Sequence, residues 1–219
     1  MKKSFTVFAL LLCTAFLGAA QTQPGQLKIV DRLMDQSRVS NPRGNRPVEY
    51  IMLHFSSDCS AHPESPYNID SVIGTLSHGN ASANYIIDRD GTVYRLVKED
   101  RVAWHAGKGA LPWAPYYTNS LNSHSIGIEM LGISTWKDMK MFVSKATFDK
   151  IPKEDIGFTD AQYKAVNLLI ADIRSRWPLI KMDRHHIVAH STYAPTRRTD
   201  PGEVFDWTKI GLPKELPKE

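Results

Sequence analysis

Two histidines and one aspartate stand where they could hold a metal ion. His54 lies near the end of the apolar run 49–56, and His190 ends the run 186–190. A strand that ends in an imidazole can aim that side chain into a cleft. Asp200 follows ten residues after His190, in an Asp-Pro-Gly sequence that is also typical of a simple turn. Two imidazoles, one carboxylate and a position left open for water form the ligand set of a catalytic zinc ion.

A glutamate in a buried-looking strand is the first candidate for a proton-transfer group. Glu129 lies in the run 125–131, whose other residues are apolar apart from Ser125 and Gly127. Burial of a carboxylate is costly unless the group is paired or used in catalysis. The alternative is a glutamate that faces solvent from the outer side of the strand.

Strands and helices must position these residues, and the sequence predicts both. Runs of buried-strand length occur at 49–56, 125–131 and 186–190, and residues 84–87 and 92–97 flank an Asp-Gly pair typical of a hairpin turn. Apolar residues recur at helical spacing after Asn68, and a long amphipathic helix is expected from Thr159 or Asp160 to about Trp177. We therefore predict an α/β (mixed α+β) fold with a central mixed β-sheet flanked by helices.

The composition is that of one globular domain. The chain has 219 residues, of which 42% are hydrophobic and 23% charged, and this fits a single domain with short tails. Residues 21–46 are polar and contain proline and glycine, so we expect a linker or N-terminal extension. The catalytic domain is expected at 47–210, and residues 211–219 are expected to form a tail. The net charge of +4 includes no basic cluster, so we expect a monomer with no nucleic-acid partner.

Residues 1–20 have the pattern of a secretion signal peptide. Lys2 and Lys3 precede an apolar run at 5–17, and the small residues at 18–20 suit cleavage before Gln21. The run is too short to span a bilayer comfortably, and no later segment has the apolar length of a transmembrane helix. We expect an exported protein, periplasmic or secreted, in which Cys59 is the single remaining cysteine and no intramolecular disulfide forms.

Several short segments, in a fixed order, resemble one enzyme family. They are the hairpin at 85–94, AWHAG at 103–107, NSHSIGIE at 122–129, TDAQY at 159–163, VAHS at 188–191, TDPG at 199–202 and FDW at 205–207. Together they resemble the zinc N-acetylmuramoyl-L-alanine amidases of the amidase-2 type. These enzymes are related to the animal peptidoglycan recognition proteins and to the amidase-type phage lysozymes. The resemblance covers about residues 50 to 207.

The resemblance implies a fold, a cofactor and a reaction. The fold is a mixed sheet with helices packed on it, in agreement with the predicted elements. One zinc ion per chain would be bound by His54, His190 and Asp200. The implied reaction is hydrolysis of the amide bond between N-acetylmuramic acid and L-alanine in peptidoglycan or its fragments, in wall degradation, remodelling or recycling.

The resemblance also implies catalytic roles for three residues. Glu129 matches a glutamate proposed as catalytic in members that process anhydro-muropeptides. Tyr85 matches a catalytic tyrosine of other branches, although it could equally be a core aromatic residue of the hairpin. Arg198 stands where the family often has lysine. An arginine stays charged, so it could stabilise an oxyanion but could not donate a proton.

Three further residues are assigned to substrate binding by the same resemblance. His105 and Trp104 would line the substrate cleft, although His105 could instead form a structural hydrogen bond beneath a loop. Asn84 would lie on one side of the groove, at a position where many relatives have histidine. The segment 136–157 is longer than in compact members, and it could form a flap over the cleft or a surface helix.

Two alternative functions remain open from the sequence. Some proteins of this fold have lost a metal ligand and only bind muropeptides, whereas this chain keeps all three. The other alternative is a hydrolase on the same scaffold that acts on a different acyl-amino-acid amide. The products released from peptidoglycan would distinguish these functions.

Overall fold

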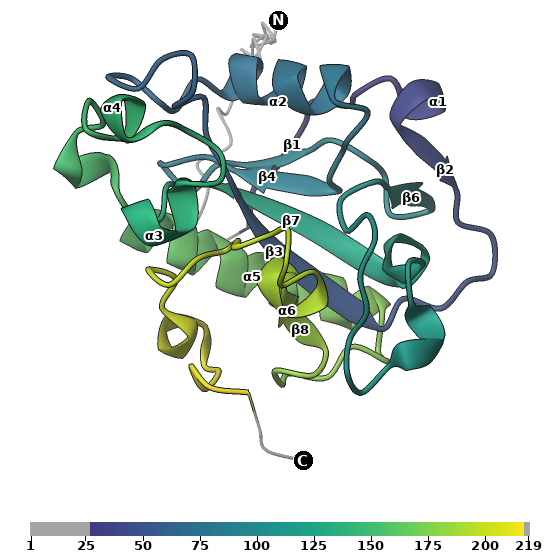
Figure 1. Cartoon of the computed structure of the whole chain (residues 1–219). Helices are drawn as coiled ribbons and strands as arrows, with labels where there is room; N and C mark the ends of the chain where they lie inside the picture. The colour runs from purple at the N-terminus through teal and green to yellow at the C-terminus, as the bar shows by residue number, and fades with distance from the viewer. Residues whose placement is uncertain (1–26, 217–219) are drawn as a thin grey trace, which may run out of the picture.

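The centre of the molecule is a mixed β-sheet (Figure 1). The computed structural model describes residues 27–216, and within them six strands form this sheet. Their spatial order is β1 (Ile29–Asp31), β5 (Val93–Arg95), β4 (Tyr85–Ile87), β7 (Ser125–Leu131), β3 (Tyr50–Ser56) and β8 (Ile187–Ala189). All neighbours are parallel except the hairpin of β4 and β5. The predicted central mixed sheet is confirmed.

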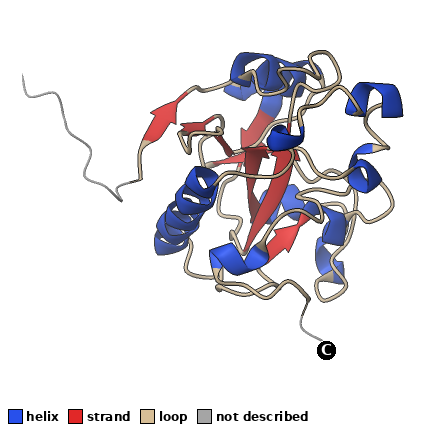
Figure 2. Ribbon diagram, turned by 90° about the vertical axis from the view of Figure 1, so that its left-hand side faces the viewer, coloured by secondary structure: helices blue, strands red, loops and turns tan. Residues whose placement is uncertain are grey.

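Two helices cover opposite faces of the sheet, as Figure 2 shows for the red strands between blue helices. The longer helix, α5 (Asp160–Arg176), begins with the capping box of Thr159 and Gln162, which satisfies backbone N–H groups at the helix start. Its apolar face packs on one side of the sheet. The second helix, α2 (Ile69–His78), packs on the other side, over β4 and β7.

The remaining elements are short and lie in the connections. The α-helices are α1 (Gln36–Val39), α3 (Trp136–Met139), α4 (Lys145–Phe148) and α6 (His190–Tyr193), and the 3-10 helices are η1 (Pro115–Tyr117), η2 (Leu121–His124), η3 (Lys153–Asp155) and η4 (Trp207–Ile210). Strands β2 (Ser40–Pro42) and β6 (Arg101–Ala103) form a separate antiparallel pair. Between residues 27 and 216, no helix is both long and apolar enough to cross a bilayer.

Strand register decides which side chains share a face. In the parallel pair of β3 and β7, His54 lies opposite Glu129. Side chains alternate along a strand, so Leu53 and its partner Ile128 point to the other face, where they pack beneath α5. The face away from α5 therefore carries both His54 and Glu129.

The folded unit begins earlier than the predicted boundary at residue 47. Strand β1 pairs with β5, and β2 pairs with β6. Arg43 is fully buried, and its guanidinium donates hydrogen bonds to four backbone carbonyls, those of Glu99, Arg101, Ser123 and Ser125. The segment predicted as a linker is therefore integrated into the domain. The predicted signal peptide at 1–20 lies outside the described residues.

Candidate metal centre

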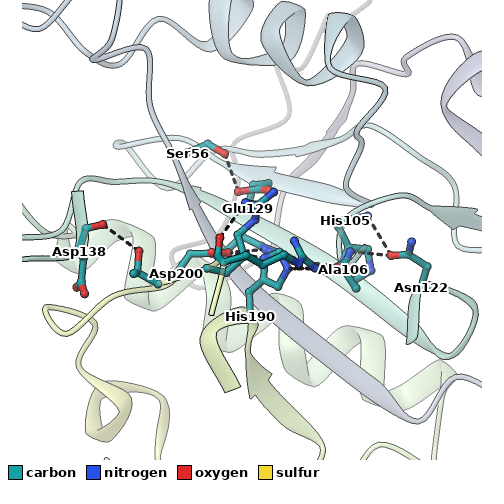
Figure 3. Close-up of polar contacts among 12 residues, drawn as sticks. Ser56, His105, Ala106, Asn122, Glu129, Asp138, His190 and Asp200 are labelled. Carbon is teal, nitrogen blue, oxygen red and sulfur yellow. Dashed lines mark hydrogen bonds and ion pairs between the residues drawn. The ribbon is translucent and has the colours of Figure 1, made fainter. Parts of the chain in front are cut away.

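The three candidate metal ligands converge at one point, and Figure 3 labels two of them, His190 and Asp200. His54 comes from the end of β3, His190 from the start of α6 and Asp200 from the loop that follows. All three are buried, and their ligand atoms lie within 4.8 Å of one another. Oδ2 of Asp200 lies 2.7 Å from Nδ1 of His54 and 3.0 Å from Nδ1 of His190. Segments up to 146 residues apart in the chain thus place their donor atoms together.

The donor set fits a zinc ion. The outer nitrogen of each imidazole is occupied by the protein, because Nε2 of His190 lies 2.9 Å from the Ala106 carbonyl and Nε2 of His54 lies 3.1 Å from Nδ1 of His105. A carbonyl can only accept, so Nε2 of His190 carries the proton and Nδ1 presents a lone pair. Imidazole nitrogens and one carboxylate that face a common point, with their outer atoms hydrogen-bonded, are typical of zinc sites.

Burial and the local charges favour the ionisation states that a cation requires. Burial lowers the pKa of His54 to about 4, so this imidazole is neutral at physiological pH. A neutral imidazole and an ionised carboxylate are the forms that bind zinc.

Glu129 lies beside the metal ligands on the neighbouring strand. Its carboxylate is buried, and Oε2 accepts a hydrogen bond of 2.6 Å from Oγ of Ser56. Burial raises the pKa of Glu129 to about 8, and the Asp200 charge adds to this effect, while Ser56 and Arg198 oppose it. The inward-facing alternative for Glu129 is therefore the one that the structure shows.

The ligands and Glu129 lie in a cavity of about 350 Å³. Its walls are largely apolar, and they include Val72 and Leu76 from α2, and Met139, Phe142 and Val143 from α3 and the residues after it. The segment 136–157 thus contributes one wall of the cavity, as the flap alternative expected. Asp138 attaches this segment to the loop that carries Asp200, because its Oδ2 accepts from Oγ of Ser134 and from the backbone N–H of Glu203.

Arg198 also reaches the cavity. Its Nη1 donates to the Arg197 carbonyl over 3.0 Å, and the side chain is half-buried. Among residues 27–216, Arg198 forms no ion pair with a carboxylate. The guanidinium is therefore placed to interact with a negative charge in the cavity.

Tyr85 lies on the wrong face of the sheet for catalysis. It pairs with Ile128 rather than with Glu129, so its side chain points toward α5. Its hydroxyl donates a hydrogen bond of 2.7 Å to the partly buried carboxylate of Glu99, which also accepts from Arg176 and from the indole of Trp177. The prediction that Tyr85 transfers a proton is wrong, and the core-aromatic alternative is correct.

The predicted substrate-binding residues either form hydrogen bonds within the protein or do not line the cavity. Asn84 is fully buried, and its amide bonds the backbone of Val97, Lys98 and Gly127. Trp104 is half-buried and is not among the residues that line the cavity. His105 reaches the cavity, but both of its ring nitrogens are bound by protein groups. The structural alternative for His105 is therefore the one observed.

One contributor to the site was missed in the sequence. Ser56 bonds Glu129, and its position two residues after His54 places both side chains on one face of β3, a spacing that could have revealed it. Phe142 lines the cavity although 41% of its surface is exposed. Phe142 belongs to the segment 136–157, so this position agrees with the flap alternative. Cys59 is buried beside the same cavity.

Comparison with known proteins identifies the family. The sequence pattern of the N-acetylmuramoyl-L-alanine amidase family matches residues 44–203. The chain belongs to this family. Its members hydrolyse the amide bond between N-acetylmuramic acid and L-alanine, and the chain is an enzyme of this class. The matched residues include all three candidate ligands and Glu129.

Individual relatives agree with this assignment. The 1,6-anhydro-N-acetylmuramyl-L-alanine amidase AmpD of Citrobacter freundii is 30% identical over 174 residues, which cover 78% of this chain and 74% of the relative. The N-acetylmuramoyl-L-alanine amidase AmiD of Escherichia coli K12 is 27% identical over 184 residues, covering 80% of this chain and 55% of AmiD.

Solved structures of the family share the fold. A crystal structure of an AmpD derivative superposes with a TM-score of 0.59 at 23% identity, covering 83% of this chain and 92% of that one. Escherichia coli AmiD, solved with an anhydro-N-acetylmuramic acid peptide as substrate, superposes with a TM-score of 0.54 at 27% identity, covering 78% and 57%. The mixed sheet with flanking helices is therefore the fold of this family.

Proposed function

We propose that this amidase is zinc-dependent, with His54, His190 and Asp200 as the zinc ligands and Glu129 as the proton-transfer group. One observation carries the proposal. The three ligand atoms converge at the base of the cavity, and Glu129 lies on the adjacent strand with its side chain on the same face as His54. Amide hydrolysis requires a polarised carbonyl, a nucleophilic water and a proton for the leaving amine, and this arrangement supplies all three.

The residues divide the chemistry between them. A zinc ion, when bound, lowers the pKa of water and polarises the carbonyl as a Lewis acid. Glu129, whose ionised form a bound cation would favour, takes a proton from the attacking water as the new C–O bond forms, and returns it to the alanine nitrogen as the C–N bond breaks. Arg198 stabilises the negative charge on the carbonyl oxygen of the tetrahedral intermediate. The products are the free carboxylate of the muramic acid and a peptide with a free N-terminal L-alanine.

The proposed substrate class is peptidoglycan fragments. Relatives named as 1,6-anhydro-N-acetylmuramyl-L-alanine amidases, and the substrate in the AmiD structure, support anhydro-muropeptides as substrates. The largely apolar walls of the cavity suit the methyl groups of the acetyl, lactyl and alanyl units, while the buried polar groups lie at its base. Intact peptidoglycan is the competing substrate that the experiment below includes.

We also propose that the protein is exported and acts as a monomer. The basic and apolar pattern of residues 1–20 supports export to the periplasm or medium. The three candidate ligands and the cavity are complete within one chain, so the proposed site does not need a residue from a second copy. N-terminal sequencing of the protein from cell fractions tests the first point, and the first residue should be Gln21. Sedimentation analysis tests the second.

A product map of digested substrate tests the proposed function. Purified protein is incubated with an anhydro-muropeptide or with intact peptidoglycan, and the products are analysed by mass spectrometry. We expect peptides that begin with L-alanine and glycans that remain uncut, loss of activity with a chelator, and recovery with zinc. His190→Ala should contain little zinc and show no cleavage. Binding of muropeptides without cleavage by zinc-loaded protein would instead favour the binding module, and products cut elsewhere would favour another hydrolase.

A further inference from the structure

The strongest unassigned feature is the loop segment 104–107, which contacts both candidate imidazole ligands through their Nε2 atoms. We propose that this segment is an orienting element, in which the His105 side chain and the Ala106 carbonyl fix the protonation and direction of His54 and His190. His105 is then a positioning residue rather than a substrate-binding residue. This inference rests on the proposed function, because it requires a zinc ion bound by these imidazoles.

The His54 side of this arrangement is a chain of three hydrogen bonds. Oγ of Ser125 donates to the Leu121 carbonyl over 2.7 Å. A hydroxyl has one hydrogen, so the same Oγ accepts from Nε2 of His105, 3.1 Å away. The neutral His105 ring then has a lone pair on Nδ1, which accepts from Nε2 of His54 over 3.1 Å. The chain leaves the lone pair of His54 on Nδ1, the atom that faces Asp200.

The His190 side is shorter and ends on a backbone carbonyl. Nε2 of His190 donates to the Ala106 carbonyl over 2.9 Å, which leaves the lone pair on Nδ1. The guanidinium of Arg197 donates to the same carbonyl and also to the carbonyl of Lys108. His105 and Ala106 thus fix the two imidazoles in the same tautomer and direction, with Nδ1 of each ring facing the Asp200 carboxylate.

Two neighbours hold the segment in place. Oδ1 of Asn122 accepts from the backbone N–H groups of both His105 and Ala106, over 3.0 and 2.7 Å (Figure 3). Gly127 of β7 lies directly under the His105 ring, and a Cβ at this position would be 2.5 Å from Cγ of that ring. Absence of a side chain at 127 therefore makes room for the imidazole between the strand and His54.

The direct effect of orienting the His54 and His190 imidazoles is on the affinity for zinc, and any effect on catalysis follows from zinc binding. If the hydrogen bond from Nε2 of His54 is lost, His54 can carry its proton on Nδ1 instead. Nδ1 then has no lone pair with which to bind zinc. Removal of such an outer partner typically weakens metal binding by about 10- to 100-fold. Ser125 is fully buried and does not line the cavity, so its contact with His105 is sheltered from solvent.

Zinc affinity of the full-length protein tests the inference. Ser125→Ala removes the acceptor for His105, and zinc binding is measured by competition with a fluorescent chelator. We expect the affinity for zinc to fall by about 10- to 100-fold. Ser40→Ala is the matched control, because Ser40 is a buried serine that also donates to a carbonyl and accepts from a side-chain N–H, but bonds neither His105 nor a candidate metal ligand. Its zinc affinity should equal that of the wild type.

A spectroscopic readout separates orientation from general loss of structure. In ¹⁵N-histidine NMR spectra of the zinc-loaded wild type, His54 should show a protonated Nε2 and a metal-bound Nδ1. Metal-free Ser125→Ala should show a mixture of His54 and His105 tautomers. Gly127→Ala, which displaces the His105 ring without removing a polar group, should weaken zinc binding in the same direction.

The outcomes distinguish the two proposals. If the wild type binds no zinc, the proposed function and this inference both fail. If the wild type binds zinc while Ser125→Ala and Gly127→Ala bind it equally tightly with unchanged histidine spectra, only the orienting role fails. Equal weakening in the Ser40→Ala control would also refute the orienting role, because it would assign the effect to lost stability.

Discussion

Replacement of Glu129 by glutamine should reduce activity and stabilise the fold together. Glutamine keeps the volume of the side chain and can still accept the hydrogen bond from Ser56, but it cannot take up a proton. Loss of a general acid–base group typically lowers kcat by roughly 10²- to 10⁴-fold. Zinc content should be unchanged, because Glu129 is not one of the three convergent ligands.

The gain in stability follows from the raised pKa of Glu129. Burial raises this pKa from 4.5 to about 8, so the metal-free native state holds the proton at pH values where the unfolded chain has released it. A state that binds more protons loses stability as the pH rises, so the contribution of Glu129 falls between about pH 4.5 and pH 8 and is constant above that range. At pH 7 the difference amounts to about 3 kcal/mol. The neutral glutamine does not incur this loss.

Denaturant unfolding of the metal-free proteins measures the effect. The free energy of unfolding of Glu129→Gln minus that of the wild type should be near zero or slightly negative at pH 4.5, and should rise by up to about 3 kcal/mol by pH 7. Turnover of an anhydro-muropeptide by the zinc-loaded proteins gives the catalytic loss. If the difference in the free energy of unfolding between Glu129→Gln and the wild type did not change with pH, the raised pKa of Glu129 would be refuted. Wild-type turnover in the variant would refute its role in proton transfer.

Three further substitutions test other parts of the site and fold. Arg198→Ala should lower kcat by roughly 10²-fold whereas Arg198→Lys keeps most activity, and near-wild-type kinetics of the alanine variant would reject oxyanion stabilisation. Phe142→Ala should raise KM about tenfold with little change in kcat, because it removes part of an apolar wall of the cavity. Met141 is a neighbour that does not line the cavity, so Met141→Ala should leave KM unchanged in the same assay. Glu99→Gln should lower the free energy of unfolding at pH 7 by about 2 kcal/mol, because Glu99 is a partly buried acceptor for three donors. Burial alone would raise the pKa of Glu99, but these donors hold it below the ordinary value of 4.5, so the loss should shrink as the pH falls through that lower pKa. An equal loss in unfolding experiments at about pH 3 and pH 7 would contradict this reasoning.

Local patterns in the sequence were sufficient for the main elements and for the candidate metal ligands. The apolar runs around residues 50–56 and 125–131 became β3 and β7, because a strand buried on both faces needs apolar residues on both sides. The Thr159 cap and the helical spacing after it became α5, since capping and periodicity are properties of contiguous residues. His54 and His190 were recognisable because each follows such a run.

Only the tertiary structure decided which side chains face the site. Tyr85 and Glu129 both occur in buried strands, and neither sequence segment determines the register between β4 and β7. The observed register places Tyr85 opposite Ile128, one residue away from Glu129, and a shift of one residue reverses the face. Register is a relation between two strands that lie 38 or more residues apart, so a pattern within one of them does not determine it.

The surroundings of the metal site depended on the fold for the same reason. The role of His105 follows from its contacts with His54, Ser125 and Gly127, which come from two different strands. The integration of residues 29–43 follows from pairing with β5 and β6, which are more than 50 residues away in the chain. Sequence alone identifies side chains with suitable chemistry, whereas strand pairing and packing decide which of them meet, because those contacts form between segments that are distant in the chain.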